Sequence, residues 1–342
     1  MSSLVSLTRV REDIREAVRQ AMELAGFAEA IEKDAEVAVK PNLGWDLCIP
    51  GSVTSPLVLD AVLEVVRERT TRLFVVEAGQ VLENIERVRK RLGLDAILAR
   101  HGAQWVNLSR SKRRPVRVPD ARVFPEIGIP EPLDRAHLLT LPVLKTHDKT
   151  KLSGAIKNQW GCIPEFRHNF HLVLDDALID ILRVLRPRFA VMDATVALEG
   201  DGPKSGWPRI LGLMLASRDA VALDWVQGQI MGFAPDEVRH LALAAEAGLG
   251  KAAAADIRVV GEDLDSARVQ FRRARSNLVS RVELACRRSA VRKLVFDTPL
   301  FDLALAGAKA YYYLWYFLGG GRRRAAEVVA HPLYGRGWEF LR

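Results

Sequence analysis

The stretch from residue 141 to residue 164, LPVLKTHDKTKLSGAIKNQWGCIP, gathers the side chains best suited to chemistry. It begins as an apolar run and then carries four lysines, one histidine and one asparagine within fourteen residues. Lysine ammonium groups attract anions, and a histidine can take up or release a proton near neutral pH. The pattern therefore predicts a site for a small anion, either a carboxylate or a phosphate.

Within this stretch we predict Lys145, His147 and Lys157 as catalytic residues, and Gly154 and Asn158 as substrate-binding residues. Gly154 lets a backbone come close to a ligand, and a helix beginning there would direct its positive end toward an anion. The amide of Asn158 can donate to an oxyanion or accept from a donor. For His147 three interpretations stay open: general base, metal ligand, or loop histidine without a chemical role.

The elements that must position these residues follow from hydrophobic periodicity. We expect strands at residues 36–39, 73–76, 104–107, 137–144, 189–192, 210–216 and 257–260, and helices at 11–33, 54–66, 82–101, 154–160, 172–185, 220–231 and 236–247. Short strands alternating with helices predict an α/β fold with a mostly parallel twisted sheet flanked by helices. This body would span residues 1–266, and two sub-lobes with a boundary near 109–135 are an open alternative.

Polar residues stand at the carboxyl ends of several predicted strands, where parallel α/β sheets bind their ligands. Lys40 and Asn42 follow the first of these strands, and Glu77 follows the second. We predict all three as substrate-binding residues. Lys40 precedes a proline that fixes the local backbone, which suits a charge held in one position.

Carboxylates after the fifth predicted strand indicate a second kind of site. Asp193, Glu199 and Asp201 could hold a hard divalent cation such as Mg²⁺ through their oxygen atoms. The alternative is that they only cap and end a turn-rich loop. His168 and His171, three residues apart, are expected at the rim of a pocket rather than on a metal.

Composition excludes some classes of protein. The chain has 342 residues, of which 49% are hydrophobic and 27% charged, so it is an ordinary globular sequence with enough length for a large core. The net charge is +8, but residues 267–342 hold 15 Lys and Arg against 5 Asp and Glu. The remaining residues hold 35 against 37, so the body is nearly neutral and nucleic-acid binding is not expected.

The basic tail, residues 267–342, is predicted to be a helical extension with its own properties. Its segment PLFDLALAGAKAYYYLWYFL is rich in aromatic residues and is followed by three consecutive arginines. Packing against the protein's own body or against a second copy of the chain is one interpretation. An interfacial helix on an anionic membrane is another. A membrane span is disfavoured, because Asp302 and Lys309 interrupt the apolar run.

Several motifs are missing from the sequence. It contains no GxGxxG at a helix start, no GxxxxGK[ST], no GxSxG and no HExxH. Its three cysteines, Cys48, Cys162 and Cys286, form no CxxC pair or ferredoxin run, so we expect no self-contained iron–sulfur cluster. The N-terminus shows no secretory signal, which favours a cytoplasmic protein.

Six segments resemble, in order, the uncharacterised domain family number 362 over about residues 36–262. They read VAVKPNLG, TSPLVLDAV, VVEAG, LPVLKTHDKTKLSGAIKNQWGCIP, VMDATVALEGDGP and LASRDAVALDWV. The resemblance implies that the family pattern includes Lys40, Asn42, Lys145, His147, Lys157, Asn158, Asp193, Glu199 and Asp224. Some members carry iron–sulfur motifs, and this chain lacks their cysteine runs. A redox role would then need a separate electron-transfer partner.

Three hypotheses for function follow. The leading one is an enzyme that binds a small anion and catalyses proton transfer, as an isomerase or lyase does. The second is a redox protein that works with an external iron–sulfur electron donor. The third is a non-catalytic accessory protein that either binds an anion or docks on a membrane through its basic tail, at the inner face of that membrane. A homo-oligomer is compatible with each of them.

Overall fold

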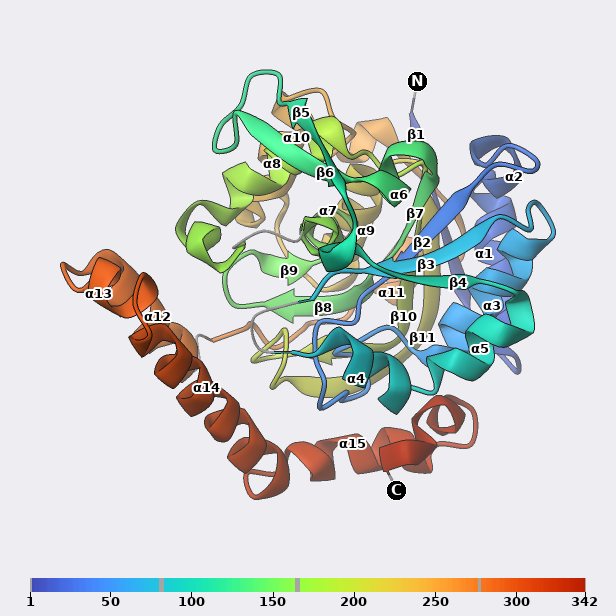
Figure 1. Cartoon of the computed structure of the whole chain (residues 1–342). Coiled ribbons are helices and arrows are strands. Elements are labelled where there is room, and N and C mark those ends of the chain that lie inside the picture. Colours follow the sequence, from blue (N-terminus) through green and yellow to red (C-terminus); the bar gives the residue numbers. More distant parts are fainter. Residues whose placement is uncertain (1, 80–82, 164–166, 276–277, 342) are drawn as a thin grey trace.

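The computed structural model describes residues 2–79, 83–163, 167–275 and 278–341. The strands in this part of the chain are β1 (Ser3–Arg9), β2 (Val37–Pro41), β3 (Leu73–Glu77), β4 (Gln104–Asn107), β5 (Arg113–Arg117), β6 (Glu126–Pro130), β7 (His137–Leu141), β8 (Val143–His147), β9 (Lys151–Ser153), β10 (Phe189–Glu199), β11 (Trp207–Ser217) and β12 (Ile257–Gly261). All but β5 and β6 join one twisted sheet, whose main path is β12-β1-β11-β10-β7-β2-β3-β4 (Figure 1). Strands β5 and β6 form a separate antiparallel pair.

Most neighbours in the main sheet run parallel. The pairs β2–β3, β2–β7, β3–β4, β7–β10, β8–β10 and β1–β12 are parallel. Strand β11 runs antiparallel to both β10 and β1, and β9 runs antiparallel to β8. The mostly parallel α/β sheet predicted from the sequence is therefore confirmed.

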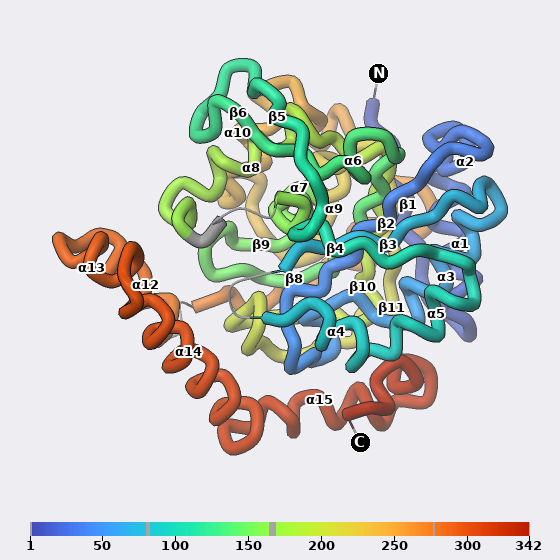
Figure 2. The backbone as a smooth tube through the Cα atoms, viewed as in Figure 1, coloured from blue at the N-terminus to red at the C-terminus, as the bar shows by residue number. Residues whose placement is uncertain are grey.

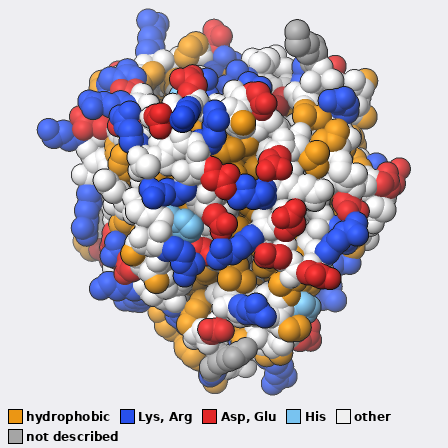
Figure 3. All heavy atoms as spheres, turned by 90° about the vertical axis from the view of Figure 1, so that its right-hand side faces the viewer, with side chains coloured by type: hydrophobic (Ala, Val, Ile, Leu, Met, Phe, Trp, Pro, Cys, Tyr) orange, Lys and Arg blue, Asp and Glu red, His pale blue; other side chains and the backbone are white. Residues whose placement is uncertain are grey.

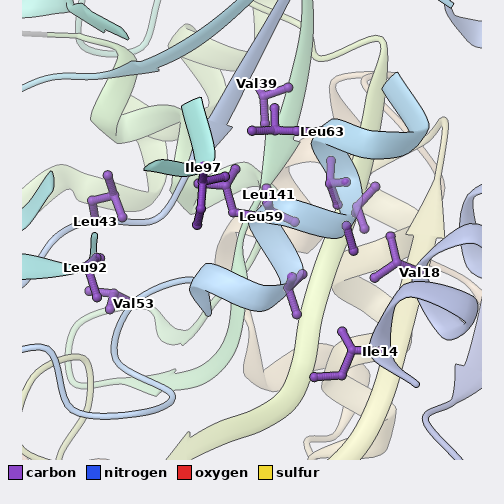
Figure 4. Packing of buried hydrophobic residues seen from close by; sticks show 14 of the residues in the cluster. Ile14, Val18, Val39, Leu43, Val53, Leu59, Leu63, Leu92, Ile97 and Leu141 are labelled. Carbon is purple, nitrogen blue, oxygen red and sulfur yellow. The ribbon is translucent and has the colours of Figure 1, made fainter. Parts of the chain in front are cut away.

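Helices cover both faces of the sheet. They are α1 (Ile14–Leu24), α2 (Phe27–Ala30), α3 (Pro56–Arg67), α4 (Ile85–Arg91), α5 (Leu94–His101), α6 (Glu131–Arg135), α7 (Ala155–Asn158), α8 (Leu174–Val184), α9 (Ala220–Ile230), α10 (Arg239–Glu246), α11 (Leu264–Ala267), α12 (Leu278–Arg288), α13 (Arg292–Phe296), α14 (Leu300–Phe317) and α15 (Gly321–Ala330). One core lies between the sheet and the layer of α1, α3 and α5, and Figure 4 shows Val18, Leu59 and Leu63 within it. A second core lies on the other face, under α7, α8, α9 and α10.

Strand β1 was not expected from the sequence. Its inward-facing residues include Ser6 and Thr8, which break the apolar pattern of a buried strand. In the structure the Ser6 hydroxyl donates to the Ala21 carbonyl at 2.7 Å, and the Thr8 hydroxyl donates to the Ala17 carbonyl at 2.9 Å. Both acceptors belong to α1, so the helix satisfies the polar groups that made this strand hard to recognise.

Two predicted strand ends were placed too early. The strand expected to end at residue 192 continues as β10 to Glu199, so Asp193 lies inside a strand. The strand expected to end at residue 144 breaks at Pro142 and resumes as β8, so Lys145 and His147 also lie in a strand. The helix predicted over 82–101 is two helices, because Gly93 adopts a φ of 64° between α4 and α5.

The surface over α1, α2 and α3 carries positive and negative side chains in alternation (Figure 3). Arg15 donates to Asp60 at 2.7 Å and to Glu64 at 2.5 Å, and Arg19 pairs with Glu68 at 2.5 Å. These basic side chains are therefore paired with carboxylates.

The tail divides into two parts with different packing. Its last part, α15 and the turn Tyr334–Leu341, joins the first core, where Trp338 is only 1% exposed. Its earlier part, α12 to α14, forms an arm that leaves the body and returns along α14 (Figure 2). At the returning end of α14 the side chains of Tyr312 and Tyr316 are buried against the body. On the other side of this helix, Leu303, Leu314 and Leu318 are 69%, 58% and 82% exposed. Among the described helices, none is both long and apolar enough to cross a bilayer.

Candidate active site

A buried ion pair joins the carboxyl ends of β2 and β3. Lys40 Nζ lies 2.8 Å from Glu77 Oε2, and each side chain is 1% exposed. The same ammonium also donates to the Pro41 carbonyl at 2.9 Å and to Asn158 Oδ1 at 3.1 Å. These three partners fix the Lys40 side chain in place, and the Glu77 carboxylate balances its positive charge.

Asn158, in α7, completes this internal network. Its Nδ2 donates to the Lys40 carbonyl at 3.0 Å and to Thr140 Oγ1 at 2.9 Å. Its Oδ1 accepts from Lys40 and, at 3.3 Å, from Asn42 Nδ2. The structure thus brings Lys40, Glu77 and Asn158 together as predicted, but each is engaged with protein partners. The predicted roles of these three residues in binding substrate do not fit this arrangement.

Gly161 was not predicted, although the network depends on it. A Cβ at this position would lie 2.6 Å from both Glu77 Oε1 and Lys40 Nζ. Any larger residue would therefore displace the ion pair. The sequence offers no signal for this requirement, because Gly161 comes close to strand ends that are far away along the chain.

Asn42 connects the network to a second lysine. Lys145 Nζ donates to Asn42 Oδ1 at 2.9 Å and to the Ser52 carbonyl at 2.6 Å. Both acceptors are neutral, and within the described part of the chain Lys145 forms no ion pair. Asn42 therefore orients Lys145, which is a positioning role.

The environment of Lys145 favours its neutral form. Burial, followed by the positive charges of Lys157, Lys204 and Lys40, lowers the pKa of Lys145 from 10.5 to about 7. A neutral amine has two N–H bonds, which match the two acceptors, and one lone pair. Near neutral pH this group can therefore accept a proton from a ligand.

His147 is arranged as a hydrogen-bond donor. Its Nδ1 accepts from the backbone N–H groups of Lys149 at 3.1 Å and Thr150 at 3.4 Å, so the ring proton is on Nε2. Burial and the charge of Lys157 hold the pKa of His147 well below its usual value. The ring is therefore neutral, and its 3.4 Å contact with Asp148 is not an ion pair. As a general base, His147 would need the lone pair on Nδ1, but that lone pair already accepts these two backbone hydrogen bonds.

Lys145, His147 and Lys157 line one end of a cavity of about 890 Å³. Asn42 and Lys149 also line it, and the helices α12, α13 and α14 of the arm supply a large part of its wall. The three predicted catalytic residues are thus brought together. Within the described residues, the wall does not include Lys40, Glu77 or Asn158.

A carboxylate from the arm meets the basic end of this cavity. Glu283 Oε1 lies 2.6 Å from His171 Nδ1, and Glu283 Oε2 lies 3.3 Å from Lys149 Nζ. Burial alone would raise the pKa of Glu283, but the His171 hydrogen bond and the Lys149 charge hold it far below its usual value. His171 thus lines the cavity, as expected, whereas the side chain of His168 lies outside the described part of the structure. A signal for Glu283 was available, because it is the one carboxylate in residues 267–296.

Gly154 lies beside a carboxylate of the protein itself, that of Asp224. Asp224 accepts from the backbone N–H of Ala155 at 2.6 Å and from that of Ile156 at 2.9 Å, so its carboxylate occupies the start of α7. A Cβ on Gly154 would lie 2.2 Å from Asp224 Oδ1. Burial raises the pKa of Asp224 to about 6, against the lowering effect of the two amides. In this structure the space beside Gly154, which was predicted to bind substrate, is thus occupied by Asp224.

The three carboxylates predicted as cation ligands are used separately. Asp193 accepts from the backbone N–H of Ser55 at 2.8 Å and from the Thr195 hydroxyl at 2.6 Å. Glu199 accepts from Arg209 at 2.8 Å, and Asp201 Oδ1 accepts from the backbone N–H of Arg275 at 3.3 Å. Across residues 2–79, 83–163, 167–275 and 278–341, no group of three His, Cys, Asp or Glu side chains is placed to share a metal. The predicted cation site at Asp193, Glu199 and Asp201 is therefore not formed.

Known proteins resemble this chain in sequence and in structure. The thylakoid-associated protein sll1697 of Synechocystis sp. is 27% identical over 249 residues, which cover 68% of this chain and 74% of that protein. The lactate racemase apoprotein from Thermoanaerobacterium thermosaccharolyticum superimposes with a TM-score of 0.43 and 14% identity. That superposition covers 64% of this chain but only 54% of the racemase. Residues 37–228 match the family model of the domain of unknown function DUF362, and this chain belongs to that family.

Proposed function

We propose that this chain is an enzyme that binds an anionic substrate at the basic end of the cavity and moves a proton with Lys145. The observation that carries the proposal is the environment of the Lys145 amine. It is 3% exposed, hydrogen-bonded only to neutral acceptors among the described residues, and has a pKa of about 7. A purely structural lysine would instead be expected to lie beside a carboxylate, as Lys40 does.

The surrounding groups suit a substrate that carries a carbonyl beside its anionic group. Lys149 and Lys157 supply positive charge for the anion, and the Nε2–H of His147 can donate to an oxygen that becomes negative. Lys145 then takes a proton from the carbon next to the carbonyl and returns it to the other face or to a neighbouring carbon. The proton is conserved, so this isomerisation needs no oxidant, reductant or co-reactant.

Deuterium exchange tests the reaction without knowledge of the product. The full chain is incubated in D₂O with a panel of carbonyl- and hydroxy-carboxylates, and mass spectrometry measures deuterium bound to carbon. We expect incorporation into at least one compound, reduced by about 10²- to 10⁴-fold in Lys145→Met and Lys145→Arg. Lys90→Met, an exposed site on α4, is the matched control and should exchange normally. Equal incorporation by the Lys145 variants would refute the proton-transfer role.

We infer a second property, docking of the arm on an anionic membrane surface. The specific observation is that α14 exposes Leu303, Leu314 and Leu318, while α12, α13 and α15, which precede and follow it in the chain, carry exposed arginine and lysine residues. Apolar and basic side chains together are suited to the interface of an anionic bilayer. The curated relative is described as thylakoid-associated, which agrees with this inference.

Vesicle flotation tests the docking. The wild-type chain should float with phosphatidylglycerol vesicles and much less with phosphatidylcholine vesicles. A triple variant, Leu303→Glu, Leu314→Glu and Leu318→Glu, should lose flotation, whereas Lys90→Met should keep it. Flotation of the triple variant at the wild-type level would remove the arm from the docking surface.

A further inference from the structure

The cavity that holds Lys145 has two chemically different ends. One end carries Lys145, His147, Lys149 and Lys157. Apart from Glu283 and Arg287, the part of the wall that comes from the arm is mostly apolar, with side chains that include Val279, Val282, Phe296, Phe301, Leu305 and Ala308. A ligand that only filled the basic end would leave this wall in contact with water.

The size and the charge of the cavity fit a longer ligand. Its volume of about 890 Å³ is at the upper end of the range for small-molecule sites and far exceeds the needs of a two- or three-carbon acid. Among the described residues of its wall, five Lys and Arg side chains other than the neutral Lys145 accompany three carboxylates, a balance of +2. One anionic group at the basic end would therefore find complementary charge, even with Glu283 in place.

We propose that the ligand of this cavity is a single-chain amphiphile, with a carboxylate or phosphate headgroup at Lys149 and Lys157 and a hydrocarbon chain along the inner face of α12 to α14. This proposal deepens the proposed function, since it names the substrate class of the same site. Binding of the amphiphile needs neither Lys145 catalysis nor membrane docking, so it can be measured by itself.

The chain contains its own reporter for occupancy of the cavity. Cys286, in α12, lines the cavity and is partly exposed, whereas Cys48 and Cys162 are fully buried. Alkylation of the native chain by N-ethylmaleimide should therefore modify Cys286 first. A ligand along α12 would shield this thiol.

The test compares four probes on the wild-type chain. Laurate and dodecyl phosphate should slow alkylation of Cys286 by about tenfold when present at ten times their dissociation constant. Acetate has the headgroup without the chain, and dodecyltrimethylammonium has the chain with the opposite charge, so both should leave the rate unchanged. Protection by acetate equal to that by laurate would overturn the amphiphile. Equal protection by the cationic probe would overturn the anionic headgroup, and protection by none of the probes would overturn the site itself.

A pair of variants locates the hydrocarbon chain. Ala308→Trp adds bulk to the apolar wall, whereas Ala310→Trp adds it at an exposed position of α14 outside that wall. Direct calorimetric titration with laurate should show weakened binding for Ala308→Trp and unchanged binding for Ala310→Trp. Unchanged binding in both would contradict the placement of the chain, and far-ultraviolet circular dichroism checks that both variants are folded.

Two further experiments distinguish where the ligand comes from and test ligand binding separately from the proposed reaction. Laurate delivered in phosphatidylcholine vesicles should protect Cys286 as well as free laurate if the ligand enters from a bilayer, and less well if it enters from water. Lys145→Met should still bind laurate. Binding without deuterium exchange in the wild-type chain would therefore refute the proposed reaction and leave the amphiphile site intact.

Discussion

Two buried lysines on strands β2 and β8 of the main sheet have opposite surroundings. Lys40, on β2, contacts a carboxylate at 2.8 Å and lies in a network of side chains that satisfies its charge. Lys145, on β8, is held by two neutral oxygen atoms and lies among other lysines. Asn42 touches both regions, because it donates to Asn158 and accepts from Lys145. The comparison separates a lysine held in an ion pair from the lysine that we propose exchanges a proton.

The difference depends on which hydrogen-bond acceptors surround each lysine ammonium group. A buried ammonium with a carboxylate keeps its charge, whereas a buried ammonium with only neutral acceptors is easier to deprotonate. Lys40 therefore organises the strand ends, and Asn42 transmits that order to Lys145. The two lysines should respond differently to the same substitution.

Lys40→Met should give the largest loss of stability. The substitution leaves Glu77 buried without its cation, which costs about 3–5 kcal/mol in the free energy of unfolding. Denaturant unfolding followed by circular dichroism measures the loss. The double variant Lys40→Met and Glu77→Leu should recover most of it, because no buried charge is stranded. A single variant as stable as the wild type would mean that the ion pair does not organise this region.

Lys145→Met should change the pH dependence of stability. The native amine is neutral above about pH 7, while the unfolded chain keeps this lysine protonated up to about pH 10.5. In that window unfolding takes up a proton, so rising pH stabilises the native wild-type chain by about 1.4 kcal/mol per pH unit. The variant lacks this gain. Its stability relative to the wild type should therefore be highest near pH 7 and fall toward pH 10.

Denaturant unfolding of both proteins at several pH values gives that difference, and other titrating groups cancel in it. A difference that stays constant between pH 7 and pH 10 would show that the folded chain leaves Lys145 charged.

Gly154→Ala should have the smallest effect of the three, about 1–3 kcal/mol of lost stability. The new methyl group would overlap Asp224 Oδ1, which lies 2.2 Å from the ideal Cβ position. Gly228→Ala, in α9, is the matched control, because its Cβ would lie at an ordinary contact distance of 3.7 Å from the nearest atom, Leu152 Cδ2. A Gly154→Ala chain with wild-type stability would mean that Asp224 does not require a glycine at the start of α7.

The sequence predicted the mostly parallel sheet, because apolar periodicity is a local signal, but it placed the ends of the strands that carry Asp193 and Lys145 too early. It could not separate Lys40 from Lys145, since that difference arises from Glu77 and Ser52, which lie elsewhere along the chain. The tautomer of His147 was also beyond reach, because it depends on which backbone amides face Nδ1. Asp224 was named by the resemblance, but its place at the start of α7 required the fold.

The apolar wall of the cavity could not be predicted for a different reason. Its residues in α12 and α14 follow the family-matched segment, and their spacing only indicates amphipathic helices. Whether such helices face a membrane, a second copy or a cavity depends on the path of the whole tail. In the structure one surface of the arm lines the cavity and another is exposed.

The protonation state of Lys145 tests the central claim most directly. Nitrogen-15 labelling of the lysine side chains, with Lys145→Arg to assign the signal, gives the chemical shift of Lys145 Nζ as a function of pH. The account predicts a titration with its midpoint near pH 7, well below the ordinary value of 10.5. A midpoint at or above about 10, the ordinary range for lysine, would contradict it.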